Sequence, residues 1–417
     1  MKPTNGEGHS GARSTGTQVG TLTQATLRII WQEHRISRAE IARRAGLSRS
    51  TVTEIVDELL TTGLVSEVGV GPSRGGRPPI VLEFNYQAGC ILGVDMGATH
   101  VAVALTDLRG EVLGWQHRFH SVRTDPVGTR ALIAELCTKC LDSEPGSRKR
   151  LLGVGVAVPC PVDPKHPDHF STLVLPDWRG RGELKSLATR FRVPLFVDND
   201  ANLGALAERW WGAGRGVDDF AYVKVATGVG SGHFLQGDVY RGATGVAGEI
   251  GHLAIDPNGR PCVCGLRGCL ATLVGAPALV ERAAELRARF PNSILSQTSP
   301  TIETIEDAAL LGDPLAMQIV TEAAGHLGIA IAGLLNLMNP RLVIVGGGIA
   351  RLGDRLLEPL REVIRSRTLV SSLAVAEVRT SELGPRSIAV GAATYVLVAA
   401  LDDMRLFPCA REHSRSA

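Results

Sequence analysis

The stretch Glu249-Ile-Gly-His252, followed by Cys262-Val-Cys264-Gly-Leu-Arg-Gly-Cys269, decides more about this chain than any other part of it. It places one imidazole and three thiols at short spacings in a loop rich in glycine. Four such ligands can close a tetrahedral zinc site of the Cys3His type, in which a filled shell gives zinc a structural role. Buried cysteines with an unrelated histidine are the alternative, but cysteines so close together favour metal binding. The predicted ligands are His252, Cys262, Cys264 and Cys269.

The composition bounds the class of protein. At 417 residues the chain is long enough for two or three domains, and a hydrophobic content of 44% supports a sizeable core. The formal net charge of +2 is too small to indicate a nucleic-acid partner, so that prediction must rest on local charge. We find no stretch long and apolar enough to cross a membrane. Residues 1–20 are polar, without the apolar core of a signal peptide, and we expect them to form a disordered tail.

The cysteines indicate a cytoplasmic protein. Three of the eight belong to the predicted metal site, so they do not form the framework of a secreted disulfide protein. Cys137 and Cys140 make a C-x-x-C pair, but leucine and isoleucine recur around them at helical spacing, without a thioredoxin-like context. Packing within a helix is therefore favoured over a redox role.

Residues 21–85 carry the pattern of a winged helix-turn-helix. Apolar residues at helical spacing predict three helices, the second opened by a capping box from Ser37 to Glu40 and the third capped by Ser48. The pattern then becomes extended, and two predicted strands flank the basic, glycine-rich segment 71–79. Two strands joined by such a tip form a wing. A small helical packing domain with an arbitrary basic surface is the alternative.

The polar face of the third predicted helix suits the major groove of DNA. It carries short hydrogen-bond donors and a long cation near the helix N-terminus. Arginines held between glycine and proline at the wing tip suit a narrow minor groove. The residues that we expect to contact DNA are Arg38, Ser48, Arg49, Ser50, Thr53, Arg74 and Arg77.

From Cys90 onward, strand and helix patterns alternate, which predicts an α/β architecture. Glycine-rich segments follow predicted strands at Asp95-Met-Gly97-Ala-Thr99, Thr227-Gly228-Val-Gly230 and Gly346-Gly347-Gly. Backbone amides in such turns can cradle a phosphate or approach a nucleotide closely. A carboxylate, that of Asp200, lies just beyond another predicted strand. Each glycine motif alone is a weak signal, but their order along the chain is specific.

That order resembles the ROK family of repressors, open reading frames and sugar kinases over nearly the whole of residues 90–401. The resemblance implies a two-lobed, actin-like ATPase (ribonuclease H-like) fold for residues 86–404, with a zinc loop at 249–271 and a flexible tail at 405–417. It also implies that Asp200 matches the base that takes the proton from the sugar hydroxyl in family kinases. The residues matched to sugar binding are Asn199, Asp200, Glu249 and His252. Those matched to phosphate or nucleotide binding are Gly97, Thr99, Thr227, Gly228, Gly230, Gly346 and Gly347.

The sequence also departs from the pattern of the family's kinases. Ala98 and Ala226 stand where those kinases usually have glycine, Ala271 where they have glutamate, and His100 replaces a common lysine. A lost charge-assisted hydrogen bond costs about 1.5–3 kcal/mol, and phosphoryl transfer depends on positioning, so small errors around the phosphates compound. We therefore expect a vestigial kinase site that keeps its sugar cleft and does not use ATP. Alternatively, Ala271 makes room for a substituent on the sugar.

Repressor members of the family carry a segment like residues 21–84, which the kinases lack. The resemblance thus implies a sugar-responsive DNA-binding regulator, a repressor, whose kinase-like module senses a sugar or sugar phosphate. A homodimer or homotetramer with two-fold symmetry predicts an inverted-repeat operator. Two alternatives stay open. One is an active sugar kinase with Asp200 as its catalytic base, and the other is control by a partner protein while the cleft is empty.

Overall fold

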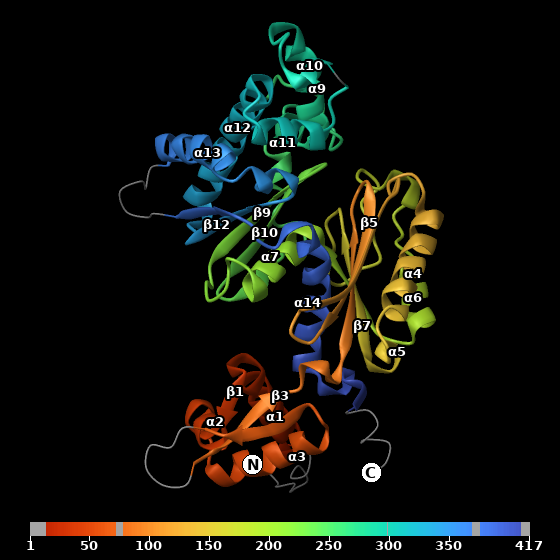
Figure 1. Ribbon diagram of the computed structural model, residues 1–417, viewed down its shortest axis with the longest axis vertical. Helices are drawn as coiled ribbons and strands as arrows, with labels where there is room; N and C mark the ends of the chain where they lie inside the picture. The colour runs from red at the N-terminus through yellow and green to blue at the C-terminus, as the bar shows by residue number, and fades with distance from the viewer. Residues whose placement is uncertain (1–13, 72–77, 298, 369–375, 410–417) are drawn as a thin grey trace, which may run out of the picture.

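The computed structural model describes residues 14–71, 78–297, 299–368 and 376–409. A small N-terminal domain lies at one end of a module with two lobes (Figure 1). This arrangement confirms the predicted fold class, an α/β module preceded by a winged helix-turn-helix.

The N-terminal domain has the expected helices and wing strands. Ser48 caps the third helix by accepting a hydrogen bond from the backbone N–H of Thr51. The strands form an antiparallel sheet in the order β1-β3-β2. The first helix begins at Ser14, so part of the segment expected to be a disordered tail is helical. The elements are α1 (Ser14–Glu33), β1 (Arg35–Ser37), α2 (Arg38–Ala45), α3 (Arg49–Thr61), β2 (Val65–Val70) and β3 (Ile80–Phe84).

The capping box predicted for α2 is only half formed. Ser37 Oγ accepts a hydrogen bond from the backbone N–H of Glu40 at 3.3 Å. The Glu40 carboxylate, which should have returned to the backbone of Ser37, pairs with the guanidinium groups of Arg43 and Arg44. Those arginines lie three and four residues further along the helix, where opposite charges meet on one face.

The first lobe is built on a five-stranded sheet with the order β6-β5-β4-β7-β8. Its strands are β4 (Cys90–Met96), β5 (His100–Asp107), β6 (Val112–Phe119), β7 (Leu151–Val158) and β8 (Leu195–Asn199). The outer side carries α4 (Pro126–Asp142), α5 (Ser147–Arg150) and α6 (Lys185–Phe191). Cys137 and Cys140 are both buried in α4, as a packing role requires.

The second lobe repeats this topology. Its sheet has the order β11-β10-β9-β12-β13. If the strands of each lobe are numbered from 1 to 5 along the chain, both sheets have the same spatial order, 3-2-1-4-5. The strands are β9 (Phe220–Val225), β10 (Val229–Leu235), β11 (Asp238–Tyr240), β12 (Leu342–Gly346) and β13 (Glu377–Thr380). The helices are α8 (Ala271–Val274), α9 (Ala276–Leu286), α10 (Ile294–Gln297), α11 (Ile302–Leu310), α12 (Pro314–Met338) and α13 (Asp354–Arg367).

Two helices, α7 (Asp200–Trp211) and α14 (Ser387–Asp402), lie between the two sheets (Figure 1). Glycines in the first sheet let α14 approach closely. A Cβ at Gly93 would lie 1.9 Å from the carbonyl oxygen of Ala389, and one at Gly155 would lie 1.9 Å from that of Ala392. Because α7 also packs on β9 and β10, these two helices connect the lobes.

Two helices correct the expectation that no stretch could cross a membrane. By length and composition alone, α12 and the segment Gly384–Asp402 around α14 pass that test. Of their most apolar windows, however, 61% and 67% are buried inside the protein. Neighbouring elements that cover them explain their apolar composition, as for interior helices of a folded domain.

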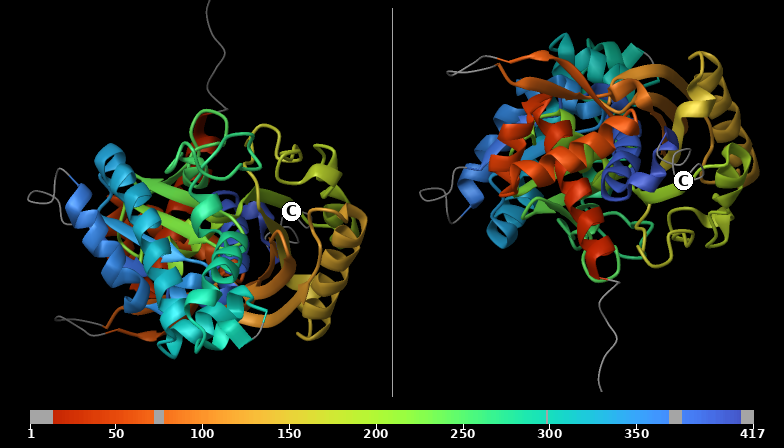
Figure 2. Two further views of the ribbon diagram at one scale, coloured as in Figure 1. Left: turned by 90° about the horizontal axis from the view of Figure 1, so that it is seen from above. Right: turned by 90° about the horizontal axis from the view of Figure 1, so that it is seen from below.

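One apolar core joins the N-terminal domain to the first lobe. Leu27 of α1, Leu108 after β5 and Leu401 of α14 belong to the same buried cluster. Phe407 is fully buried in this cluster, so the segment 405–417, expected to be a flexible tail, starts with packed residues. Viewed from below, the N-terminal helices lie beside the C-terminal end of α14 (Figure 2).

Candidate functional site

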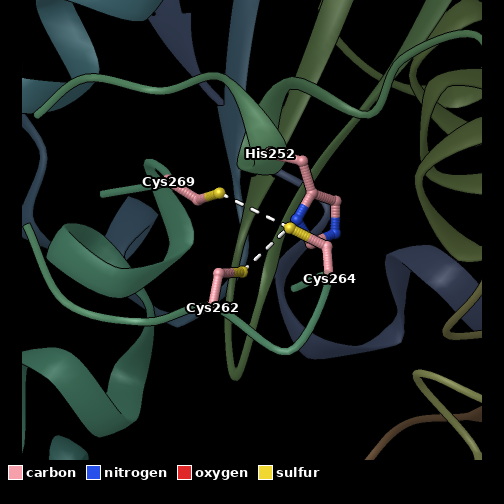
Figure 3. Close-up of side chains that lie close together, drawn as sticks. All are labelled: His252, Cys262, Cys264 and Cys269. Atoms are coloured by element: carbon pink, nitrogen blue, oxygen red, sulfur yellow. Dashed lines mark hydrogen bonds between the residues drawn. The ribbon is translucent and has the colours of Figure 1, made fainter. Parts of the chain in front are cut away.

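The four predicted metal ligands come together in one loop (Figure 3). Their ligand atoms all lie within 4.8 Å of one another. Cys264 Sγ is 3.6 Å from Cys269 Sγ, and Cys262 Sγ is 3.5 Å from His252 Nδ1. In a tetrahedral site with the metal about 2.3 Å from sulfur and about 2.1 Å from nitrogen, two sulfur ligands lie about 3.8 Å apart, and a sulfur and a nitrogen ligand lie about 3.6 Å apart. These two pairs therefore have the spacing of neighbouring ligands around a tetrahedral metal ion.

Gly268 shows why this loop needs glycine. Its φ is +63°, and a Cβ there would lie 1.4 Å from the carbonyl oxygen of Asp256. Its own carbonyl accepts hydrogen bonds from the backbone N–H groups of Ile255 and Asp256. A larger residue would displace the backbone that carries Cys269.

His252 connects the metal cluster with Glu249. The Nδ1 atom of the ring faces Cys262, and the Nε2 atom lies 3.8 Å from Glu249 Oε2. Burial, and after it the negative charge of Asp200, raises the pKa of the Glu249 carboxyl to about 7. Three of the four residues matched to sugar binding, Asp200, Glu249 and His252, are thus neighbours.

Asn199, the fourth, caps α7 where β8 ends. Its Oδ1 accepts hydrogen bonds from the backbone N–H groups of Ala201 at 2.9 Å and Asn202 at 3.3 Å. Its Nδ2 donates to the carbonyl oxygen of Cys160 at 3.1 Å. The side chain therefore positions α7, a role that the sequence analysis missed, and one amide hydrogen is left over for a ligand.

Asp198 is a residue that the sequence analysis missed. It is 2% exposed, and its Oδ2 accepts from Arg241 Nε at 2.8 Å and Nη2 at 2.6 Å. Its Oδ1 accepts from Asn202 Nδ2 at 3.1 Å. This carboxylate is balanced by its own arginine, so it anchors the start of α7.

Lys224 is the most consequential residue that the sequence analysis missed. It lies on β9, and its Nζ is 2.6 Å from Asp200 Oδ2. The side chains of this pair are only 14% and 12% exposed. A lone lysine in the otherwise apolar strand Phe220–Val225 was the available signal.

The turn between β4 and β5 is the first predicted phosphate segment. His100 Nε2 lies 3.2 Å from Asp95 Oδ2. The His100 ring also covers Gly97, because a Cβ on that glycine would lie 2.3 Å from the imidazole. Thr99 is exposed at the tip of the turn. The histidine that replaces the usual lysine thus occupies the space next to the turn.

The second predicted phosphate segment spans the turn between β9 and β10, which holds Thr227 and Gly228, and the start of β10, which holds Gly230. The backbone N–H of Ala226 donates to the carbonyl of Gly228 at 2.9 Å and closes the turn. A Cβ at Gly228 would meet nothing within 4 Å, so internal packing does not require this glycine. An open backbone of this kind is accessible to a ligand.

In the third segment, packing explains the glycines. A Cβ at Gly346 would lie 2.2 Å from Tyr222 Oη. Gly347 has a φ of +88°, and a Cβ there would lie 1.9 Å from the carbonyl oxygen of Val225. Both glycines are required where β12 meets β9, whether or not a nucleotide binds.

In the N-terminal domain, Arg38 is already paired. Its Nη1 donates to Glu67 on β2 at 2.7 Å, and its Nη2 donates to Asp57 on α3 at 2.9 Å. Arg38, which we predicted to contact DNA, therefore braces the wing against the third helix.

The remaining predicted DNA contacts lie near the start of α3. Thr53 Oγ1 donates to the carbonyl of Arg49 at 2.8 Å, and the hydroxyls of Ser48 and Ser50 are 2.8 Å apart. Arg49, Ser50 and Thr53 are exposed. Arg49 is the long cation that this surface offers. The predicted contacts of the wing tip, Arg74 and Arg77, lie outside the described residues.

The helix that begins with Asp200 ends against the N-terminal domain. Trp31 of α1 packs on Trp210 and Trp211 at the end of α7, with ring centroids 4.7 and 5.9 Å apart. Trp31 Nε1 donates to the carbonyl of Leu108 at 3.0 Å, and Trp211 Nε1 donates to Thr394 Oγ1 of α14 at 2.8 Å. We call these three indoles the tryptophan contact.

Comparison with family models agrees with this architecture. The model of the ROK family matches residues 91–399, and that of the MarR family matches residues 21–67. A duplicated two-lobed module behind a winged helix-turn-helix is thus the class of protein, and the chain belongs to the ROK family.

Among its relatives, repressors match nearly the whole chain. A putative xylose repressor of Caldicellulosiruptor sp. (strain Rt8B.4) is 32% identical over 394 residues, 92% of this chain and 96% of that protein. The DNA-binding transcriptional dual regulator NagC of Escherichia coli (strain K12) is 32% identical over 384 residues, 92% of this chain and 93% of that protein.

Among the solved structures, a regulator matches more of this chain than a kinase does. A ROK family transcriptional regulator, described as a homolog of the E. coli MLC protein, superposes with a TM-score of 0.79 at 28% identity, covering 93% of this chain and 98% of that one. A ROK family glucokinase from Streptomyces griseus, solved with glucose and AMPPNP, gives a TM-score of 0.67 at 30% identity, covering 74% of this chain and 99% of that one.

Proposed function

We propose that this protein is a sugar-responsive transcriptional repressor whose winged helix-turn-helix binds DNA and whose kinase-like module senses a sugar or sugar phosphate. The observation that carries the proposal is the continuous packing along α7, which starts among the predicted sugar ligands and ends at the tryptophan contact. Similarity to a xylose repressor and to NagC over nearly the full length supports it. Because its target is DNA, we place it in the cytoplasm.

The sugar site in this proposal consists of Asp200, Glu249 and His252, with the remaining amide hydrogen of Asn199. Carboxylates accept hydrogen bonds from sugar hydroxyls, and the ring nitrogen of His252 that faces Glu249 points away from the cysteines. Ala271, at the start of α8, has a methyl group where the family's kinases carry a carboxylate, which is consistent with a sugar that bears a substituent.

We infer that the Cys3His cluster binds zinc. Thiolate and imidazole ligands in tetrahedral geometry suit this ion, and four protein ligands leave no open position for catalysis. Held through Nδ1, His252 would present its other nitrogen in a fixed orientation to Glu249 and a sugar.

A sugar bound at the start of α7 would act on DNA binding through the other end of the helix. A small shift of α7 against α1 would move the N-terminal domain, because one apolar core contains residues of both helices. In a homodimer or homotetramer, such a shift changes the spacing of two recognition helices on an inverted-repeat operator.

A second candidate function is an active sugar kinase. The likeness to a glucokinase solved with glucose and AMPPNP favours it, as does an aspartate at position 200. A coupled assay with ATP and a panel of hexoses and pentoses separates the candidates. Turnover that Asp200→Asn abolishes would establish the kinase.

The repressor proposal is tested with DNA selected from a random duplex library by the purified protein. Fluorescence anisotropy then gives the affinity for the selected duplex, alone and with each member of a panel of monosaccharides and their phosphates. We expect Arg49→Ala to weaken DNA binding roughly tenfold or more, and Arg118→Ala, in the first lobe, to leave it unchanged.

The sugar arm of the experiment uses Glu249→Ala, which leaves the pair of Lys224 and Asp200 in place. We expect this variant to bind DNA normally and to lose the response to sugar. Glu281→Ala, an exposed carboxylate of the same lobe, is the matched control. Failure to enrich any duplex sequence, even at low ionic strength, contradicts the proposal.

A further inference from the structure

The ammonium group of Lys224 pairs with one buried carboxylate and lies in the electrostatic field of a second. Lys224 is on β9 of the second lobe, Asp200 begins α7, and Asp95 lies at the end of β4 in the first lobe. Burial by itself favours the neutral amine, but the carboxylates of Asp200 and Asp95 outweigh it and raise the pKa of Lys224. The protein therefore holds a permanent positive charge at this point.

Asp95 is the second of these carboxylates, and its nearest partner is His100. Its side chain is 5% exposed, and its Oδ2 lies 3.2 Å from His100 Nε2. Within the part of the chain that the structure describes, its Oδ1 has no hydrogen-bond partner. Burial opposes ionisation, but the His100 hydrogen bond and then the charges of His100 and Lys224 keep the pKa of Asp95 below its usual range. An ionised oxygen without a donor is costly unless a cation is near.

Carboxylates that lie beside glycine-rich turns are the ligands that a hard divalent cation takes. We propose that Lys224 is a built-in cation that replaces a divalent metal ion at Asp95 and Asp200, and that it thereby keeps metal-bound nucleotides out of this site. The salt bridge to Asp200 and the unpartnered oxygen of Asp95 carry this proposal.

The neighbouring turn supports the same conclusion. The His100 imidazole covers the backbone at Gly97, where a phosphate oxygen would have to approach the amides of the turn. A nucleotide would thus meet a cation already in place at Lys224 and a side chain over the turn. Asp200 would keep its other oxygen for a sugar hydroxyl, while the paired oxygen would be a poor base for phosphoryl transfer.

Manganese titration followed by the electron paramagnetic resonance of free Mn²⁺ tests the proposal, with the Cys3His cluster saturated with zinc beforehand. In the wild type, and in Lys224→Arg, which keeps the charge, we expect no Mn²⁺ site with a dissociation constant below about 1 mM. Lys224→Ser should gain one site per chain, bound at least roughly tenfold more tightly. Lys224→Ser combined with Asp95→Asn should lose that gain.

Lys139→Ser, which removes an exposed lysine paired with Glu135, is the control and should behave as the wild type. A folded Lys224→Ser variant without a new site overturns the proposal. If that variant does not fold, a binding experiment on the wild type tests the proposal instead. The proposal is overturned if the complex of Mn²⁺ with AMPPNP binds to the wild type and this binding is lost in Asp95→Asn. It is supported if the complex does not bind to the wild type. These experiments involve no DNA, so their failure leaves the proposed repressor standing.

Discussion

The Cys3His loop lies near Asp200 at the start of α7, which together with Asp95 of β4 forms a pair of buried carboxylates, yet the loop and the carboxylates balance their charges by different means. The loop gathers four ligand atoms within 4.8 Å and, in our proposal, takes a cation from solution to hold them. The carboxylates of Asp200 and Asp95 have a cation from the chain, the ammonium of Lys224. In our account the metal site is still in use, whereas the site next to the phosphate turns no longer takes an ion.

The largest effect is expected from breaking the loop. Cys262→Ser should release the metal and lower the free energy of unfolding by about 5 kcal/mol or more, because the binding energy of a structural metal is folding energy. Metal analysis and denaturant unfolding measure the two quantities. Cys140→Ser, at a buried cysteine of α4, is the matched control and should keep its metal. Retention of metal by Cys262→Ser would show that the ligand set is wrong.

The next largest effect concerns the carboxylates. Lys224→Met should lower the free energy of unfolding by about 3–5 kcal/mol, because it leaves a largely buried carboxylate without its partner. Lys139→Met breaks a pair whose side chains are 47% and 45% exposed, so the loss should stay below about 1 kcal/mol. Urea unfolding compares the two variants. Equal losses would mean that Lys224 is an ordinary surface lysine.

His233 shows a third way to handle charge, which is to stay neutral. It lies on β10, 2.9 Å from Ser231 Oγ, and burial lowers its pKa to about 4. The unfolded chain takes up this proton near pH 6.5 and the folded protein only near pH 4, so stability is lost as the pH falls through this window. The loss should reach about 3 kcal/mol. Urea unfolding from pH 7 to pH 4 should show a smaller loss for His233→Gln, and an unchanged loss contradicts the assignment.

The smallest effect is expected at the tryptophan contact. Trp31→Leu should leave sugar and DNA affinity within a fewfold of the wild type, but it should remove about 1–2 kcal/mol of coupling between them. Trp115→Leu, on β6 of the first lobe, is the control. Anisotropy with and without the effective sugar measures the coupling. Full coupling in Trp31→Leu would direct the search to α14 instead.

The sequence was most informative where ligands or apolar residues recur at short spacing. The metal cluster falls within one loop, and the helices of the N-terminal domain repeat their apolar residues every turn, so both could be predicted. Contacts between residues that are distant in the sequence could not be predicted. Lys224 meets Asp200 across 24 positions, and Trp31 meets Trp210 only because α7 and α1 end at the same place.

Some motif residues also turned out to have structural reasons. Gly346 and Gly347 are required by the packing of β12 on β9, and Asn199 caps α7. Arg38 braces the wing against the third helix. A residue that serves the fold keeps its identity when a reaction is lost, so these residues say little about whether nucleotide still binds.

The most direct test of the account is a reciprocal titration. The affinity of the protein for the selected DNA duplex is measured at increasing concentrations of the effective sugar, and the affinity for that sugar is measured with and without the duplex. Linkage requires that the two ratios of dissociation constants be equal, and we predict a common ratio of about 5 to 150. A ratio of one in both directions would contradict the claim that the kinase-like module controls the DNA-binding domain.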